Sequence, residues 1–240
     1  MSPMDRRTRE KQQVQERILN AARDLFAAEG FEAVTMRRIA EAIEYTPGAL
    51  YVHFRDKAEL IRALCRNDYE ALRLATEDLR RTEADPVRRI WAMGHGYLSF
   101  AAAHPNHYKL MFMTSPPAGV EPDAEDLACM EDPDRDGYAA LVESVMQAMA
   151  QGRWRADLKD PELVAQTLWA ALHGVVALQI VYGHDPLWQM RPWDERAKEM
   201  AVTVLRGMLR DPGEIERMPD LGTVEQWRGG EAGADKEAAS

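Results

Sequence analysis

Apolar side chains recur along most of this chain with the spacing of an amphipathic α-helix. In residues 14–29, for example, Val14, Ile18 and Phe26 share one face, and Gly30 follows as a helix-ending residue. Strict alternation of apolar and polar residues, the pattern of a half-buried strand, does not occur. The sequence therefore predicts an all-α fold, with helices over residues 14–29, 35–43, 46–54, 56–79, 86–104, 106–113, 137–152, 160–182 and 193–209.

Residues 35–57 carry the most specific pattern, two short helices separated by a tight turn. Thr35 can cap the first helix. The periodicity then stops and restarts at Thr46-Pro47, because threonine suits an N-cap and proline suits the first helical position. The apolar residues expected to face a shared core are Ile39, Ala40, Ile43, Leu50 and Phe54. Two short helices of this kind indicate a helix-turn-helix, with the second helix as the DNA reader.

The run IAEAIEYTPGALYVHFRDKAEL, residues 39–60, resembles the DNA-binding domain of the TetR/AcrR family of one-component bacterial regulators. The family pattern is approximately IAxxAGVSxGxLYxHFxxKxxL. Glu44 departs from it, since it stands where the family has glycine in the turn. A left-handed backbone at Glu44 would cost about 1 kcal/mol relative to glycine.

The resemblance implies phosphate contacts at the two helix starts and along the reader helix. These contacts fall on Thr35, Thr46, Tyr51 and Lys57, with Pro47 and Gly48 letting the backbone of the reader helix approach a phosphate. For base edges we expect Arg37, Ala49, Val52 and His53. Tyr51 has an alternative role, because its ring can also pack under the turn.

Charge is distributed unevenly along the chain. Residues 1–80 hold 14 Lys and Arg against 14 Asp and Glu, so the net charge of -10 belongs to residues 81–240. Binding to DNA would therefore depend on local basic residues and would be sensitive to salt. Residues 1–12 form a basic arm that either enters the minor groove or is a solvated end.

The chain beyond the reader indicates a helical bundle that binds a ligand and forms the dimer. The segment WAALHG, residues 169–174, resembles the Trp-x-x-x-His-Gly signature of one C-terminal subgroup of the same family, and residues 97–112 resemble the upstream motif of that subgroup. Helical spacing alone makes each aromatic residue here a core residue, and His173 fits a hydrogen-bonded core position. Taken together, however, nine of these residues could line an adaptable apolar cavity: Trp91, His95, Phe100, Tyr108, Met111, Phe112, Met146, Trp169 and His173.

Several other classes of protein are disfavoured. The apolar window 163–182 is interrupted by Gln166 and His173, which favours a buried or dimer-interface helix over a membrane span. Cys65 and Cys129 do not make a disulfide framework. HExxH, GxSxG and P-loop motifs are absent, so no catalytic residue, cofactor or metal is predicted. The charged N-terminus lacks a secretory signal, and we expect a cytoplasmic protein.

The sequence thus predicts a basic arm (1–12), a helix-turn-helix domain (13–60), a ligand-binding and dimerisation domain (61–211) and a disordered tail (212–240). The predicted function is a homodimeric repressor that a small apolar or aromatic effector releases from a palindromic operator. One alternative is an activator or an effector-independent regulator. Another is a small-molecule binding protein with weak DNA binding.

Overall fold

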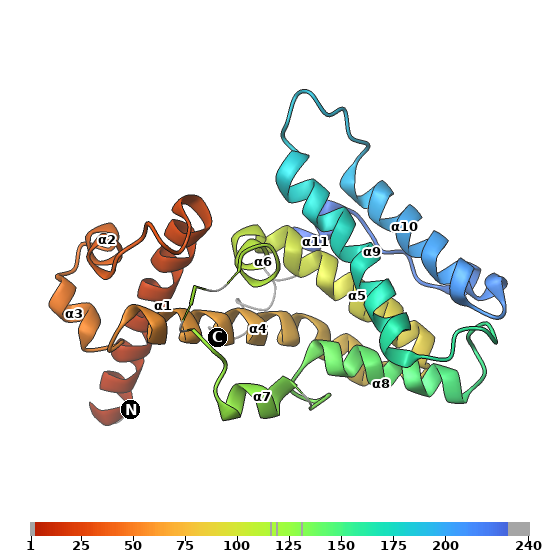
Figure 1. The fold of residues 1–240 in the computed structure, drawn as a ribbon, viewed down its shortest axis with the longest axis horizontal. Coiled ribbons are helices and arrows are strands. Elements are labelled where there is room, and N and C mark those ends of the chain that lie inside the picture. Colours follow the sequence, from red (N-terminus) through yellow and green to blue (C-terminus); the bar gives the residue numbers. More distant parts are fainter. Residues whose placement is uncertain (1–2, 116, 119, 131, 230–240) are drawn as a thin grey trace. The chain divides into compact units, whose positions relative to one another are not determined.

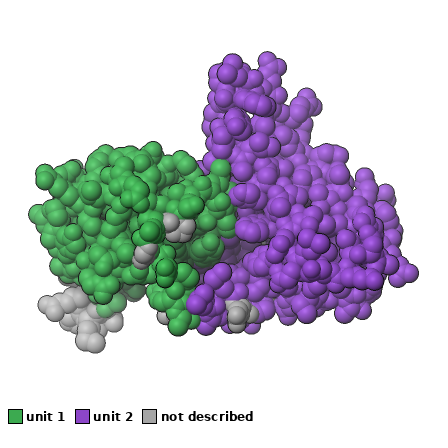
Figure 2. Space-filling model, viewed as in Figure 1, with its two compact units in different colours: residues 1–69, 106–126 green, residues 70–105, 127–240 purple. Residues whose placement is uncertain are grey.

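A computed structural model describes residues 3–229 except 116, 119 and 131. The described chain is helical and holds no strand beyond one isolated bridge between Trp154 and Leu209, which confirms the all-α prediction (Figure 1). The chain forms two compact units (Figure 2). Unit 1 contains residues 1–69 and 106–126, and unit 2 contains residues 70–105 and 127–240.

Unit 1 is built around the helix-turn-helix. Its elements are α1 (Pro3–Glu29), α2 (Met36–Ala42), α3 (Pro47–Tyr51), the first part of α4 (Lys57–Thr82), and α6 (Pro105–Phe112). Their apolar faces meet in one core, because every helix contributes residues at helical spacing. Fully buried members of this core include Ile18, Ala22, Val34, Ile39, Ala40, Leu50 and Leu60.

The first helix is longer than predicted, since α1 begins at Pro3 and residue 14 was expected to start it. The predicted basic arm is therefore helical from Pro3, and the side chains of residues 3–7 lie outside the described part. At the other end, Gly30 adopts a left-handed φ of 82° and donates its N-H to the Phe26 carbonyl at 2.9 Å. This is the glycine stop that the sequence predicted.

Unit 1 also contains α6, which we had assigned to the downstream domain. Polar contacts explain the difference. Asn106 donates to Asp24 at 3.1 Å, the Lys109 ammonium donates to the Ala27 carbonyl, and Leu110 joins the unit 1 core. The boundary between the units lies inside α4 at residues 69–70, whereas the sequence analysis begins the ligand-binding domain at residue 61.

Unit 2 is a helical bundle made of α5 (Pro86–Ala103), α8 (Gly137–Ala150), α9 (Pro161–Tyr182) and α10 (Trp193–Met208). The short α7 (Ala124–Met130) crosses the boundary. Helix starts follow one rule here: Asp85, Asp136 and Asp160 each accept backbone N-H bonds from the first turn of the helix that follows. Helices α9 and α10 lie side by side (Figure 1).

The segment after α10 differs from the predicted disordered tail. It contains a 3-10 helix, η1 (Pro212–Arg217), and a final helix, α11 (Val224–Gly229). Leu221 and Trp227 are buried at 2% and 1% exposure, so these apolar anchors hold the segment against unit 2. Residues 230–240 lie outside the described part.

Helix α9 leaves most of its apolar surface uncovered. It buries Val164, Ala165 and Val176, whereas Leu163, Leu178 and Val181 are 61%, 44% and 54% exposed. By length and composition α9 is the one helix among the described residues that is apolar enough to cross a membrane. A face of this kind needs a cover of some sort, because large exposed apolar patches mark interaction surfaces.

The turn between α2 and α3 contains the only non-glycine residue with positive φ among the described residues, Glu44 at 60°. We predict that Glu44→Gly raises the free energy of unfolding by about 0.5–1 kcal/mol, because relief of left-handed strain exceeds the entropy that glycine costs. Urea denaturation measures this change. Glu41→Gly, inside α2, is the matched control and should destabilise by about 1 kcal/mol. A loss of stability in Glu44→Gly would contradict the strain at this position.

Candidate nucleic-acid interface

Helix α2 begins with the predicted threonine cap. The Thr35 hydroxyl accepts the Arg38 N-H at 3.1 Å. After α2 the chain reverses through Glu44, and the Tyr45 N-H reaches back to the Ala40 carbonyl at 2.9 Å. This bond closes the turn that aims the next helix.

Helix α3 is anchored on one side and open on the other. Leu50 is fully buried and Phe54 nearly so, as predicted, whereas Tyr51 and Val52 are 54% and 75% exposed. Five residues cannot hold a helix by themselves, so the buried pair fixes its orientation. Exposed side chains of this size are thereby presented outward from the helix-turn-helix.

The start of α3 leaves polar groups and space free for a partner. The Thr46 side chain makes no capping hydrogen bond, although Pro47 occupies the first helical position as predicted. A side chain added at the exposed Gly48 would meet nothing of this chain closer than 4.0 Å. The small residue is therefore not required by internal packing, and its use fits close approach by an external group such as a phosphate.

The basic residues around α3 are paired with acidic groups of the same chain. Arg37 bonds Glu41 at 2.9 Å, Arg38 bonds Glu29 at 3.3 Å and Arg55 bonds Asp56 at 3.1 Å. Exposed pairs contribute about 0–1 kcal/mol each, so a phosphate can replace the carboxylate at little cost. The Asp56 carboxyl also accepts the Glu59 N-H, and this backbone bond, followed by Arg55, lowers its pKa.

Two predicted contact residues are partly engaged inside unit 1. The Lys57 ammonium donates to the Phe31 carbonyl and lies 5.9 Å from the Phe26 ring. His53 is half-buried, and burial, followed by the charge of Lys11, lowers its pKa. The Glu59 carboxylate accepts the backbone N-H of Arg55 at 2.7 Å.

A buried polar network lies among the helices of unit 1 that support the reader helix α3. Arg23 and Asp68, 3% and 1% exposed, form an ion pair with nitrogen-oxygen distances of 2.7 and 3.0 Å. Arg23 Nη1 donates to Asn20 Oδ1, and Nη2, which also bonds Asp68, donates to Asn67 Oδ1. His107 Nδ1 lies 3.1 Å from the same Asp68 oxygen. The network joins α1, α4 and α6, and a fully bonded buried pair of this kind fixes one arrangement of the helices.

The predicted ligand residues are divided between the two units. Tyr108, Met111 and Phe112 belong to unit 1, where the Phe112 ring lies 4.9 Å from that of Tyr108. The other six belong to unit 2 with different exposure: Trp91 and Phe100 are buried, His95 and His173 are half-buried, and Met146 and Trp169 are exposed. Helix α6 joins unit 1 through polar contacts with residues that are distant in the sequence. Helical periodicity does not report such contacts, so it could not separate the two groups.

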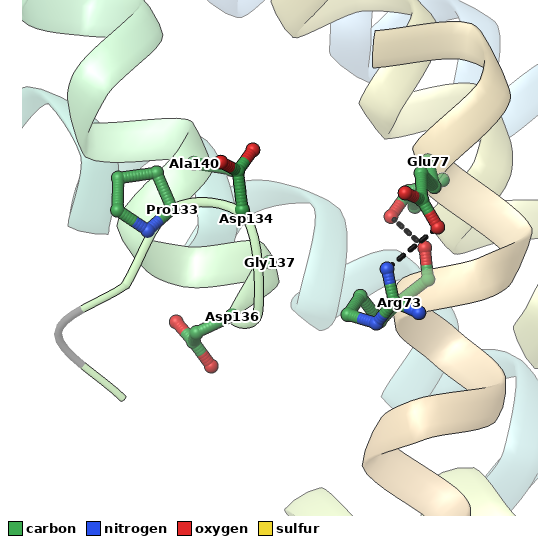
Figure 3. A pocket seen from close by; sticks show the side chains of 8 residues that line it. Arg73, Glu77, Pro133, Asp134, Asp136, Gly137 and Ala140 are labelled. Atoms are coloured by element: carbon green, nitrogen blue, oxygen red, sulfur yellow. Dashed lines mark hydrogen bonds and ion pairs between the residues drawn. The ribbon is translucent and has the colours of Figure 1, made fainter. Parts of the chain in front are cut away.

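One recess in unit 2, with about 200 Å³ of empty space that includes open solvent, has a charged lining. Figure 3 shows Arg73 and Glu77 on α4 opposite Asp134 and Asp136 near the start of α8. The ion pair between Arg73 and Glu77 has a length of 2.6 Å. None of the predicted ligand residues lines this recess, and its charge does not suit an apolar effector.

The described residues also lack a cluster of three His, Cys, Asp or Glu side chains that could hold a metal ion. His104, which the sequence places near His107, packs against Phe100 with ring centroids 5.3 Å apart. Burial, followed by the charge of Asp68, raises the pKa of the Cys65 thiol to about 11, so this thiol is unreactive.

Two models of one family match the chain. "Bacterial regulatory proteins, tetR family" matches residues 18–64, and "Tetracyclin repressor-like, C-terminal domain" matches residues 90–204. The helix-turn-helix and the helical bundle therefore define a bacterial regulator of the TetR family, to which this chain belongs. The Trp-x-x-x-His-Gly subgroup is not resolved by these matches.

Individual relatives agree with the family. The Escherichia coli K12 regulator UidR is 42% identical over 67 residues, which cover 28% of this chain and 34% of UidR. The Mycobacterium tuberculosis repressor KstR2 is 27% identical over 165 residues, 65% of this chain and 78% of KstR2. The chain thus matches about a third of the length of UidR. A TetR-family regulator from Marinobacter aquaeolei VT8 shares the fold at a TM-score of 0.66 and 18% identity, covering 85% of this chain and 98% of that one.

We predict that Asp68→Ala lowers the free energy of unfolding by about 3–5 kcal/mol, because it leaves the Arg23 guanidinium buried without its carboxylate. Urea denaturation measures this loss. The paired change Arg23→Met with Asp68→Leu should lose clearly less, since neither charge then remains buried. Equal losses in the single and the paired variants would contradict this assignment of the network.

Proposed function

We propose that this protein is a homodimeric repressor that binds a palindromic operator and leaves it when a small apolar or aromatic effector binds. The observation that carries the proposal is the geometry of α3: Leu50 and Phe54 are buried while Tyr51 and Val52 project outward. Thr35, Thr46 and Gly48 lie at helix starts with exposed polar groups, where phosphates bind.

Residue roles at the operator follow from exposure. Tyr51 and Thr46 are the phosphate contacts, and Arg37, with its side chain 80% exposed, reads a base edge by exchanging its bond to Glu41. Val52 contacts a thymine methyl. Ala49 and His53 are both half-buried, so both contribute through shape at the edge of the interface. Lys57 holds the loop before α2 and reaches a phosphate only by giving up the Phe31 carbonyl.

The exposed apolar face of α9 supports a homodimer. Apart from the nearby backbone of α9 itself, a side chain added at Gly174 would meet none of the described atoms within 4 Å, so the glycine leaves space for a crossing helix from outside. A two-fold partner packing its own α9 and α10 there would bury Leu178, Val181 and their mates in a four-helix interface. Such a cover also accounts for an apolar helix in a protein that we propose to be cytoplasmic.

The C-terminal subgroup is part of the same proposal. Trp169 and His173 share a face of α9, with ring centroids 6.2 Å apart, and the Trp169 indole donates to the Tyr97 hydroxyl at 3.1 Å. These contacts support assignment to the Trp-x-x-x-His-Gly subgroup. The solved structure of KstR2 is titled as that of a ketosteroid transcriptional regulator, and an apolar polycyclic effector would suit a helical bundle of this kind.

We predict that Tyr51→Ala weakens binding to an operator duplex, obtained by selection from random sequences, by about tenfold. This is the effect of losing one well-placed contact of about 1–2 kcal/mol. Fluorescence anisotropy at fixed salt measures the affinity. Tyr69→Ala, a 47% exposed tyrosine on α4, is the matched control and should leave affinity unchanged. Because Tyr51 is half exposed, its replacement should keep the thermal midpoint, and unchanged operator affinity would refute the assignment of the reader.

We also predict that Val181→Glu shifts the protein from dimer to monomer and abolishes high-affinity operator binding, because it places a carboxylate in a desolvated interface. Sedimentation velocity measures the oligomeric state. Leu74→Glu, at a 55% exposed leucine of α4, is the control and should remain dimeric. If Val181→Glu stays dimeric, α9 is not the interface.

A further inference from the structure

The segment that follows α10 was not expected to be ordered. We call residues 212–229 the C-terminal strap; it contains η1, a left-handed glycine at Gly222 with φ of 76°, and α11. It lies beyond residues 90–204, the part that the C-terminal family model matches.

The beginning of the strap is firmly attached. Glu214 is 8% exposed and accepts two bonds at 3.1 Å from Arg153 Nε. Arg153 Nη1 also bonds Asp85, the cap of α5, at 2.7 Å. Ile215, the residue that follows Glu214, is buried. Because these charge-assisted hydrogen bonds of Arg153 are strong, η1 is the fixed end of the strap.

The far end of the strap is inserted against α5 and α10. The Trp227 ring, 1% exposed, meets Trp193 of α10 edge to face with centroids 5.6 Å apart. The Trp91 indole donates to the Pro219 carbonyl at 2.9 Å, and the backbone of Leu221 hydrogen-bonds His95. Two of the residues predicted to bind ligand, Trp91 and His95, are thus occupied by the strap.

The far end depends on the bundle for its stability. Helix α11 has six residues, which is too short to be stable alone. Its start is a reciprocal cap, in which the Thr223 N-H donates to Gln226 Oε1 at 2.7 Å and the Gln226 N-H donates to Thr223 Oγ1 at 3.4 Å. Outside this cap, the exposed ion pair between Lys198 and Asp220 adds little. The region from Met218 to Gly229 is therefore held chiefly by the burial of Leu221 and Trp227, and it opens only when both side chains leave the bundle together.

The surface under Trp227 has unused polar capacity. Trp193 is 7% exposed, and its indole Nε1 has no hydrogen-bond partner in the described structure. If the strap lifts, Trp91 also loses its carbonyl acceptor. The uncovered site then presents two indole N-H donors and one imidazole on apolar walls, and a ligand oxygen would satisfy donors that are otherwise buried without an acceptor.

We infer that the far end of the strap is an internal occupant of an effector site on α5 and α10, and that a ligand with a flat aromatic ring and an acceptor oxygen binds by displacing it. The ring takes the place of the Trp227 indole beside Trp193, and the oxygen takes the place of the Pro219 carbonyl on Trp91. Control of operator binding by this displacement rests on the proposed function, whereas the displacement itself does not.

Indole-3-acetate is a suitable probe, because it carries both a flat ring and a carboxylate. Hydrogen exchange of the full-length protein should show residues 218–229 exchanging faster than α5 and α10 in the free protein, and faster again with saturating probe. Calorimetry should show weaker binding of cyclohexylacetate, which lacks the flat ring, and of 3-methylindole, which lacks the oxygen. Exchange of residues 218–229 that stays unchanged or slows with bound probe would overturn the inference.

A variant of the strap tests the competition between strap and probe without opening a cavity in the core. Gln226→Ala removes the cap of α11, raises the fraction of lifted strap and should tighten probe binding by about fivefold. Glu216→Ala, an exposed residue of η1, is the control and should bind as the wild type does. Equal affinity in all three proteins, or no binding in any, would overturn the inference. None of these measurements uses DNA, so failure of the proposed operator binding would be seen separately.

Discussion

The orientation of the reader depends on the burial of two residues, Leu50 and Phe54, beneath a helix of five residues. A helix this short gains almost nothing from its own hydrogen bonds. Its direction is set by those two side chains, by the turn at Glu44 and by the α1–α4 scaffold around them. The buried pair of Arg23 and Asp68 then fixes α1 against α4, so the exposed Tyr51 and Val52 inherit a rigid support.

Electrostatics shape how such a reader would meet DNA. The arginines near α3 are bonded to carboxylates of their own chain, and residues 1–80 carry no net charge. Bulk attraction to nucleic acid is therefore weak. The favourable free energy of binding arises where an arginine exchanges its own chain's carboxylate for a phosphate or a base edge of the DNA. This arrangement favours discrimination between sites over general affinity, because only a correctly placed partner compensates for every exchanged pair.

Much of this could be predicted from the sequence. Helical periodicity gave the all-α fold, and Thr35, Pro47, Gly30 and Leu50 behave as their residue types dictate. The sequence analysis did not predict contacts between residues that are far apart in the sequence. Lys57 bonds Phe31, α6 joins unit 1 through Asn106 and Lys109, and Trp227 is buried by residues far away in sequence. Local periodicity does not contain such pairings. The Thr223 and Gln226 capping pair was a usable signal for α11 that composition obscured.

We propose that two copies of this chain present their α3 helices to a two-fold symmetric DNA site. Selection of random duplexes with the purified full-length protein, repeated at several salt concentrations, tests it most directly. We expect an enriched palindrome with half-sites about one helical turn apart or slightly more, and an affinity that falls steeply with salt. Absence of any enriched site, from protein shown to be folded and dimeric, would contradict it.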